Sequence, residues 1–195
     1  MHILTVSGGL LGTNCYLAWQ EGQDCCVAID PGFEDAEILQ QIRAQGKKLE
    51  AILLTHGHFD HVGGVKLLQE ETGCRVYLHE KDLQLPAYLT HGEISATDYY
   101  GDSLHLAGLD ISVLHTPGHT PGSVCLLCEN VIFSGDTLFA STCGRTDLPG
   151  GSYPEICKSL KRLADLPGDY QVLPGHGETT TLDAERQGNP YMQGA

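Results

Sequence analysis

Basic residues are scarce in this sequence of 195 residues, which has 11 Lys and Arg against 25 Asp and Glu and a formal net charge of −14. A chain with this charge repels the phosphates of nucleic acids and the surface of anionic membranes. We therefore expect neither a nucleic-acid partner nor a membrane partner.

The hydrophobicity pattern of the sequence also gives no indication of a leader peptide or of a membrane-spanning segment. The stretch Met1–Gly12 is partly apolar but has no basic region before it, and no later run approaches the roughly 18 apolar residues of a spanning helix. We expect a cytoplasmic protein whose eight cysteines are mostly reduced and buried. Cys125 and Cys128 have the spacing of a zinc-binding pair, but they fall in a predicted strand, where residues three apart point to opposite faces. We do not expect them to share a metal ion.

Glycine and histidine are plentiful, with 24 and 10 residues. The length suits one domain over residues 1–195, and the alternation of strand-like and helical segments is typical of a layered α/β domain. Strands are predicted at Ile3–Val6, Leu10–Trp19, Cys25–Ile29, Ala51–Leu54, Arg75–Leu78, Ile111–Leu114, Ser123–Leu127, Val131–Phe133 and Tyr170–Leu173. Helices are predicted at Glu34–Ala44, Val62–Glu71 and Tyr153–Leu163, and a polar loop at Pro86–Ser103.

Five of the apolar strand-like runs end, within a few residues, in an acidic residue or a histidine. These residues are Asp30, His56, His119, Asp136 and His176. Sites in open α/β sheets lie outside the carboxyl ends of the strands, where loops present side chains. We expect the five ends to converge on one cleft.

The segment Thr55–His61 contains four candidate metal ligands, His56, His58, Asp60 and His61. A turn that contains glycine at the end of a strand can direct all four side chains into two neighbouring sites. Neutral imidazole suits zinc, iron or manganese, and a carboxylate adds a hard, charged oxygen. Asp136 has two carboxylate oxygens, so it could bridge two cations or merely cap a turn.

Several motifs resemble those of the metallo-β-lactamase-fold hydrolases, and among them those of the short glyoxalase II-like (hydroxyacylglutathione hydrolase-like) proteins. The motifs are Gly12-Thr13-Asn14-Cys15-Tyr16, Ile29-Asp30-Pro31-Gly32, the THxHxDH segment at Thr55–His61, His119, Gly135-Asp136-Thr137, Gly144-Arg145-Thr146-Asp147 and Pro174-Gly175-His176-Gly177. The resemblance implies an αββα sandwich of two mixed sheets covered by helices. We expect one domain without the C-terminal helical domain that binds glutathione in the longer enzymes.

The resemblance also implies a centre with two divalent metal ions. One ion would be held by His56, His58 and His119, the other by Asp60, His61 and His176, and Asp136 would bridge them. Asp30 would orient a ligand histidine, or would simply open the turn at Pro31-Gly32. Zinc is the expected metal, and iron and manganese are the alternatives because the same ligands accept them.

Such a centre predicts a hydrolase that acts on an ester-like bond. A hydroxide that bridges the two ions would attack the carbonyl, and Asp60 would orient it or take its proton. A thiolate leaves without a strong general acid because the pKa of a thiol is about 8.5, so a small-molecule thioester such as S-lactoylglutathione is the expected substrate. Asp60 and His61 are both present, whereas this pair is modified in the β-lactamases of the fold, so antibiotic hydrolysis is disfavoured.

Substrate contacts are less constrained by the sequence. The resemblance implies that Arg145 contacts a substrate carboxylate, although Asp147 stands where the longer enzymes have tyrosine, which leaves the thiol carrier open. Lys158, Lys161 and Arg162 would share one helix face, either for an anionic substrate or simply in contact with solvent.

Three other functions compete with this interpretation. A persulfide dioxygenase would hold a single iron with His56, His119 and Asp136. A nuclease of the same fold is disfavoured by the acidic charge. A protein in which the metal has only a structural or binding role would need a closed set of four ligands, whereas seven candidates suggest open coordination.

Overall fold

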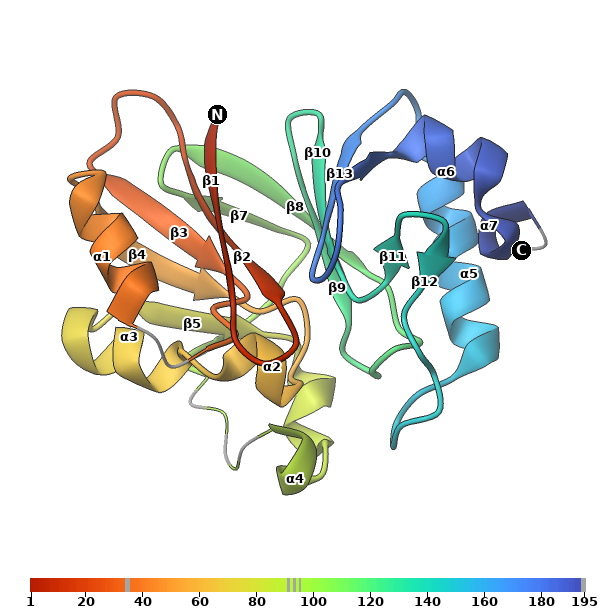
Figure 1. Cartoon of the computed structure of the whole chain (residues 1–195), viewed down its shortest axis with the longest axis horizontal. Helices are drawn as coiled ribbons and strands as arrows, with labels where there is room; N and C mark the ends of the chain where they lie inside the picture. The colour runs from red at the N-terminus through yellow and green to blue at the C-terminus, as the bar shows by residue number, and fades with distance from the viewer. Residues whose placement is uncertain (34–35, 91, 93, 95, 194–195) are drawn as a thin grey trace.

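The apolar segments of the chain form two sheets that pack face to face, with helices on the outside (Figure 1). The computed structural model describes residues 1–33, 36–90, 92, 94 and 96–193. The αββα arrangement expected from the sequence is confirmed.

The first sheet is mixed. In order across the sheet, its strands are β1 (His2–Gly8), β2 (Thr13–Trp19), β3 (Cys25–Ile29), β4 (Lys48–Leu53), β5 (Arg75–Leu78) and β6 (Asp98–Tyr99). The strands β1, β2 and β3 pair antiparallel, and β3 to β6 pair parallel. The parallel pairing places the carboxyl ends of β3 and β4 at the same edge.

The second sheet is also mixed. In order across the sheet, its strands are β14 (Thr180–Thr181), β13 (Gln171–Pro174), β10 (Val131–Gly135), β9 (Val124–Cys128), β8 (Leu109–His115) and β7 (Ser103–Leu106). The pair β10 and β13 is parallel, and the other neighbours are antiparallel. A short hairpin of β11 (Leu138–Phe139) and β12 (Thr142–Cys143) follows β10.

Helices cover the outer face of each sheet (Figure 1). The helical segments are α1 (Ala36–Ala44), α2 (Phe59–Val62), α3 (Val65–Thr72), the 3₁₀ helix η1 (Glu80–Gln84), α4 (Ala87–Thr90), α5 (Tyr153–Ala164), α6 (Leu182–Gly188) and α7 (Pro190–Gln193). In α5, Ile156, Leu160 and Leu163 recur at helical spacing and pack on Ile132 and Val172 of the second sheet. Among the described residues, no helix has the length and apolarity needed to cross a membrane.

The predicted helix Val62–Glu71 is wrong in one respect, because two helices with a break at Gly63 and Gly64 occupy this region. At the break the N–H of Gly64 donates to the carbonyl oxygen of Pro31 (2.7 Å) rather than within a helix. The packing there is close: a Cβ atom at Gly63 would lie 2.6 Å from the carbonyl oxygen of Gly32, and one at Gly64 would lie 2.7 Å from that of Phe33. The chain therefore passes the loop after β3 at a distance that only glycine allows.

Other differences concern the ends of elements. The predicted strand Leu10–Trp19 starts only at Thr13, and Leu10 and Leu11 lie in the preceding turn. The predicted loop Pro86–Ser103 contains α4 and β6, and its residues 91, 93 and 95 lie outside the described part, as do Glu34 and Asp35 of the first predicted helix. Helices α6 and α7 were not predicted, because both are short and α6 is mostly polar.

The prediction for the cysteine pair is confirmed. On β9, Cys125 packs with the α5 side of the second sheet, whereas Cys128 packs in the cluster between the sheets. The two side chains point to opposite faces of the strand, so one metal ion cannot take both.

Candidate metal centre

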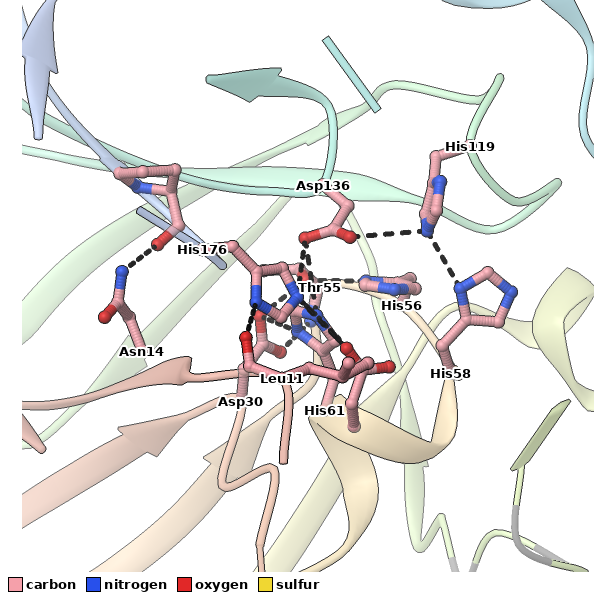
Figure 2. A network of polar contacts seen from close by, with 12 residues as sticks. Leu11, Asn14, Asp30, Thr55, His56, His58, His61, His119, Asp136 and His176 are labelled. Carbon is pink, nitrogen blue, oxygen red and sulfur yellow. Dashed lines mark hydrogen bonds and ion pairs between the residues drawn. The ribbon is translucent and has the colours of Figure 1, made fainter. Parts of the chain in front are cut away.

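The five predicted strand ends meet where the two sheets come together. Asp30 follows β3 and His56 follows β4 in the first sheet, whereas His119, Asp136 and His176 follow β8, β10 and β13 in the second. Figure 2 shows these side chains in one polar network with His58 and His61. The site is thus built from both halves of the sandwich.

The candidate ligand atoms fall into three overlapping groups, and within each group all atoms lie within 4.8 Å of one another. The groups are His56, His58 and His119; His56, His61 and Asp136; and Asp60, His61 and His176. Histidine nitrogens and carboxylate oxygens at such distances can hold two divalent ions. The seven residues that the sequence indicated are therefore all brought together.

Asp136 lies between the other ligands. Its Oδ1 is 3.3 Å from Nε2 of His61, and its Oδ2 is 3.5 Å from Nε2 of His119. Each carboxylate oxygen therefore faces a different group of histidines, which is the geometry that a bridging ligand needs. Burial alone would raise the pKa of Asp136, but His61, His119 and His176 around it outweigh burial and hold the pKa below its usual range. The carboxylate is ionised.

Two ligand histidines are oriented by a hydrogen bond at their Nδ1 atom. The hydroxyl of Thr55 donates to Oδ2 of Asp30 (2.6 Å), so the Thr55 oxygen can accept from Nδ1 of His56 (3.1 Å). The Nδ1 atom of His119 donates to the carbonyl oxygen of Arg145 at 2.7 Å. In both rings Nδ1 carries the proton, so the free lone pair is on Nε2. Nε2 is the atom directed into the site.

The loop that carries His176 is held by the start of the chain. Nδ1 of His176 donates to the carbonyl oxygen of Leu11 (3.1 Å), which again leaves Nε2 for the site. The amide of Asn14 donates to the carbonyl oxygens of Pro174 (3.1 Å) and Gly177 (3.0 Å), on either side of the histidine. Figure 2 shows the contacts of Leu11 and Asn14. The Gly12–Tyr16 motif therefore positions a ligand loop, a role that sequence reasoning did not assign.

Asp30 is buried against His61, with its Oδ2 atom 2.9 Å from Nδ1 of the ring. Its Oδ1 also accepts the backbone N–H of Thr55 at 2.7 Å. The carboxylate favours the proton on Nδ1 of His61 and leaves Nε2 for the site. The structure thus places Asp30 where a residue that orients a ligand histidine would lie.

Two histidines of the first ligand group, His56 and His58, fit a metal ion in their protonation as well as their position. Nε2 of His56 is buried without a hydrogen-bond partner among the described residues. Nδ1 of His58 lies 2.8 Å from Nε2 of His119, so two ring nitrogens of the first ligand group are in direct contact. Burial, assisted by His119, lowers the pKa of His58 to about 4, and burial lowers that of His56 well below its usual value. Both are neutral near pH 7, as metal ligands must be.

Asp60 occupies the opening of the centre. Its Oδ2 atom is 3.0 Å from Nε2 of His176, and its side chain is 13% exposed. Burial favours a raised pKa, but the hydrogen bond to His176 and the neighbouring His61 outweigh it, so the pKa of Asp60 lies below its usual value. Asp60 is therefore an ionised group that faces both the ligands and the open space beside them.

Asp82 was missed by sequence reasoning, although it connects two of the ligand loops. This buried carboxylate accepts the N–H of Gly57 (2.9 Å), between His56 and His58. It also accepts the hydroxyl of Thr120 (2.8 Å), next to His119, and the N–H of Gly122 (2.6 Å). Burial raises the pKa of Asp82, and these hydrogen bonds oppose the rise. Its position in the polar sequence after β5 gives no local signal of these contacts.

Arg145 lies beside the centre, but an acid already engages its side chain. Its Nε and Nη2 atoms donate to the two carboxylate oxygens of Asp147 at 2.8 and 2.7 Å, and both side chains are exposed. On α5, Lys158 pairs with Glu155, Lys161 lies 4.0 Å from Asp165, and Arg162 donates to the carbonyl oxygen of His115. These contacts favour the interpretation that the three basic residues of α5 lie on the surface and do not bind substrate. A substrate contact of Arg145 stays a prediction.

Comparison with known proteins agrees with this geometry. The model of the Metallo-beta-lactamase superfamily matches residues 8–176. Hydroxyacylglutathione hydrolase GloC of Haemophilus influenzae is 34% identical over 196 residues, which cover 92% of each chain. The crystal structure of TTHA1623 in a di-iron-bound form is 40% identical with a TM-score of 0.84, over 96% of this chain and 99% of that one. The structure of BLEG-1 B3 metallo-beta-lactamase is 33% identical with a TM-score of 0.87, over 98% and 99%.

Proposed function

The chain belongs to the metallo-β-lactamase superfamily and has the site of a metal-dependent hydrolase, and from this premise we propose that it hydrolyses thioesters of the S-(2-hydroxyacyl)glutathione class, such as S-lactoylglutathione. The observation that carries the proposal is the pair of ligand groups with Asp136 between them and Asp60 at the opening. The similarity to GloC of Haemophilus influenzae supports the choice of substrate class.

In this proposal two divalent ions occupy the centre. His56, His58 and His119 would hold one ion, Asp60, His61 and His176 would hold the other, and Asp136 would be shared between them. When bound, the ions lower the pKa of a coordinated water and stabilise an oxyanion. Zinc is the expected metal, with iron and manganese as alternatives, and the di-iron form of TTHA1623 is the relative that supports iron.

Asp60 has the main proton-transfer role. Its Oδ2 atom faces His176, so Oδ1 remains to accept the proton of the attacking water. Because the pKa of Asp60 lies below its usual value, the group is ionised at neutral pH, and its negative charge can orient the water. Asp30 and Thr55 keep His61 and His56 in the required orientation during this step.

The surroundings of the site favour a thiolate as the leaving group. The cleft beside Asp60 is lined mainly by apolar residues, and its only titratable lining residues among those described are Asp60 and Lys66. Asp60 is committed as the base, so a separate carboxylic acid or imidazole to protonate the leaving group is not part of this lining. A thiolate needs no such acid because its conjugate thiol has a pKa of about 8.5, whereas an amine does.

The test combines elemental analysis of the purified protein with assays of S-lactoylglutathione, a β-lactam and glutathione persulfide. We expect two metal ions per chain and release of a free thiol from S-lactoylglutathione. One iron per chain with oxygen uptake on glutathione persulfide would instead establish the dioxygenase alternative. Turnover of the β-lactam alone would overturn the thioester assignment.

A matched pair of variants separates a catalytic centre from a structural one. His58→Ala removes a ring from the first ligand group, and His105→Ala removes an exposed ring that pairs with Asp110. We expect thiol release to fall at least a hundredfold in the first variant and to stay unchanged in the second. A His58→Ala protein that loses only thermal stability would show that the metal has a structural role.

A further inference from the structure

A cleft of about 580 Å³ opens beside the metal centre, on the side of Asp60. Its lining includes Leu10 and Leu11 of the turn between β1 and β2, Phe33 after β3, Val65 and Lys66 of α3, and Ile94. A cavity of this size with mostly apolar walls suits an organic ligand of moderate length. Because Asp60 itself lines the cleft, a molecule bound here reaches the ligands directly.

One wall of the cleft is formed by the turn between β1 and β2, which exposes two apolar side chains. Leu10 is fully exposed, at 102% of the reference area, and Leu11 is 56% exposed. The carbonyl oxygen of Leu11 also accepts the hydrogen bond from Nδ1 of His176 at 3.1 Å. This hydrogen bond joins the turn of the two leucines to a ligand histidine, and an apolar ligand in the cleft would cover the leucine side chains.

Lys66 is the basic residue of this lining. It is exposed, and it makes no ion pair and no hydrogen bond through its side chain with the residues that the structure describes. Arg145, in contrast, already binds both oxygens of Asp147. In a chain with a net charge of −14, a free ammonium group at the rim of the substrate cleft is the group best placed to bind an anion.

We propose that this cleft binds an arm of the substrate that has an apolar segment and ends in a carboxylate, and that Lys66 binds this carboxylate. The inference rests on the proposed thioesterase function and extends it, because it names the substrate feature that the cleft selects. The apolar segment contacts Leu10 and Leu11, while the thioester carbonyl lies at Asp60. The carboxylate can belong to the acyl half or to the thiol half, since both halves extend from the reacting carbonyl.

Pairs of thioesters that differ only in one charge test the selection. For the acyl half, the pair is adipoyl and hexanoyl N-acetylcysteamine, in which the thiol is uncharged. For the thiol half, the pair is the acetyl thioesters of mercaptohexanoate and mercaptohexanol. The readout is kcat/KM for the charged compound divided by kcat/KM for the neutral one, and the pair with the higher ratio identifies the half that enters the cleft.

Three variants connect this ratio to Lys66. In Lys66→Met we expect the ratio to fall about tenfold through KM, because hydrogen bonds to charged groups contribute about this much. Lys66→Arg should restore most of the preference. Lys48→Met is the matched control, since Lys48 is also exposed but lies at the start of β4, at the opposite end of the strand from His56. A ratio near one in the native protein, or an unchanged ratio in Lys66→Met, would overturn the proposal.

A binding measurement separates this inference from the proposed function. Thioether analogues of the same pairs cannot be hydrolysed, and calorimetry measures their dissociation constants with the metal-loaded protein. If the charged thioether binds about tenfold more weakly to Lys66→Met but no thioester is hydrolysed, the cleft assignment stands and the thioesterase function fails. If thioesters are hydrolysed but Lys66→Met binds charged and neutral thioethers as the native protein does, the cleft assignment fails and the function stands.

Discussion

Oδ2 of Asp30 lies 2.9 Å from Nδ1 of His61, and this contact directs Nε2 of the same ring toward Asp136, 3.3 Å away. Asp30 can lie there because its backbone is left-handed, with a φ of 50°, a conformation that Asp and Asn adopt more readily than most residues. A backbone feature at the end of β3 thus determines the orientation of a ligand that follows β4.

Asp30→Asn should weaken the second metal site while keeping the backbone. Asparagine tolerates the left-handed conformation but has no negative charge to hold the proton on Nδ1 of His61. Loss of such a partner typically lowers metal affinity about 10-fold to 100-fold, so we expect one of the two ions to bind that much more weakly in a calorimetric titration. Asp110→Asn, at an exposed position, is the control and should bind both ions normally. Native affinity in Asp30→Asn would mean that Asp30 only opens the turn.

Asp82→Ala should lower both stability and affinity for the first metal ion. The substitution leaves the N–H groups of Gly57 and Gly122 without their acceptor inside the protein, and each unsatisfied buried group costs about 1–3 kcal/mol. We expect the free energy of unfolding in chelator to fall by about 3 kcal/mol, measured by urea denaturation. Because the loops of His56 and His119 are no longer joined, the affinity of one site should fall as well.

Two comparisons make the Asp82 experiment decisive. Asp82→Asn keeps one acceptor oxygen and should give intermediate values for both stability and affinity. Asp98→Ala removes a partly exposed partner of Arg75, far in the sequence from the ligand loops, and should leave metal affinity unchanged. If Asp82→Ala lost stability but bound both ions with native affinity, the residue would hold the fold together without positioning the ligands.

The contrast between Asp30 and Asp82 shows how far the sequence could predict the site. Asp30 and the other strand ends could be found because each follows an apolar strand within a few residues, so the signal is local. The partners of Asp82 lie 25, 38 and 40 residues away, and no local pattern links them. The break at Gly63 and Gly64 was missed for the same reason, because it depends on the backbone of a distant loop.

Gly175→Ala should disturb the centre from the second sheet. A Cβ atom at this position would lie 2.5 Å from Oδ1 of Asp136 and 2.5 Å from Cε1 of His61, so at least one of these side chains must move. Because a displacement of about 1 Å in a catalytic site can cost about a hundredfold in rate, we expect a loss of this order in kcat. Gly188→Ala, where an added Cβ atom meets no described atom within 4 Å, is the matched control. Equal rates for both variants would argue against a precise role for Asp136.

Removal of metal should destabilise the protein as well as inactivate it. Without ions, Asp30, Asp60 and Asp136 remain close together, and Nε2 of His56 stays buried without a hydrogen-bond partner among the described residues. Ligands that bind only the folded state stabilise it by about 4 kcal/mol at a concentration 1,000 times the dissociation constant. We therefore expect a chelator to lower the melting temperature, and added zinc, iron or manganese to restore it together with thiol release.

In His58→Ala the metal-dependent rise in melting temperature should be smaller, because the first ligand group is incomplete. A melting temperature that chelator leaves unchanged would show that the ligand cluster is stable without ions and would contradict tight metal binding at this centre.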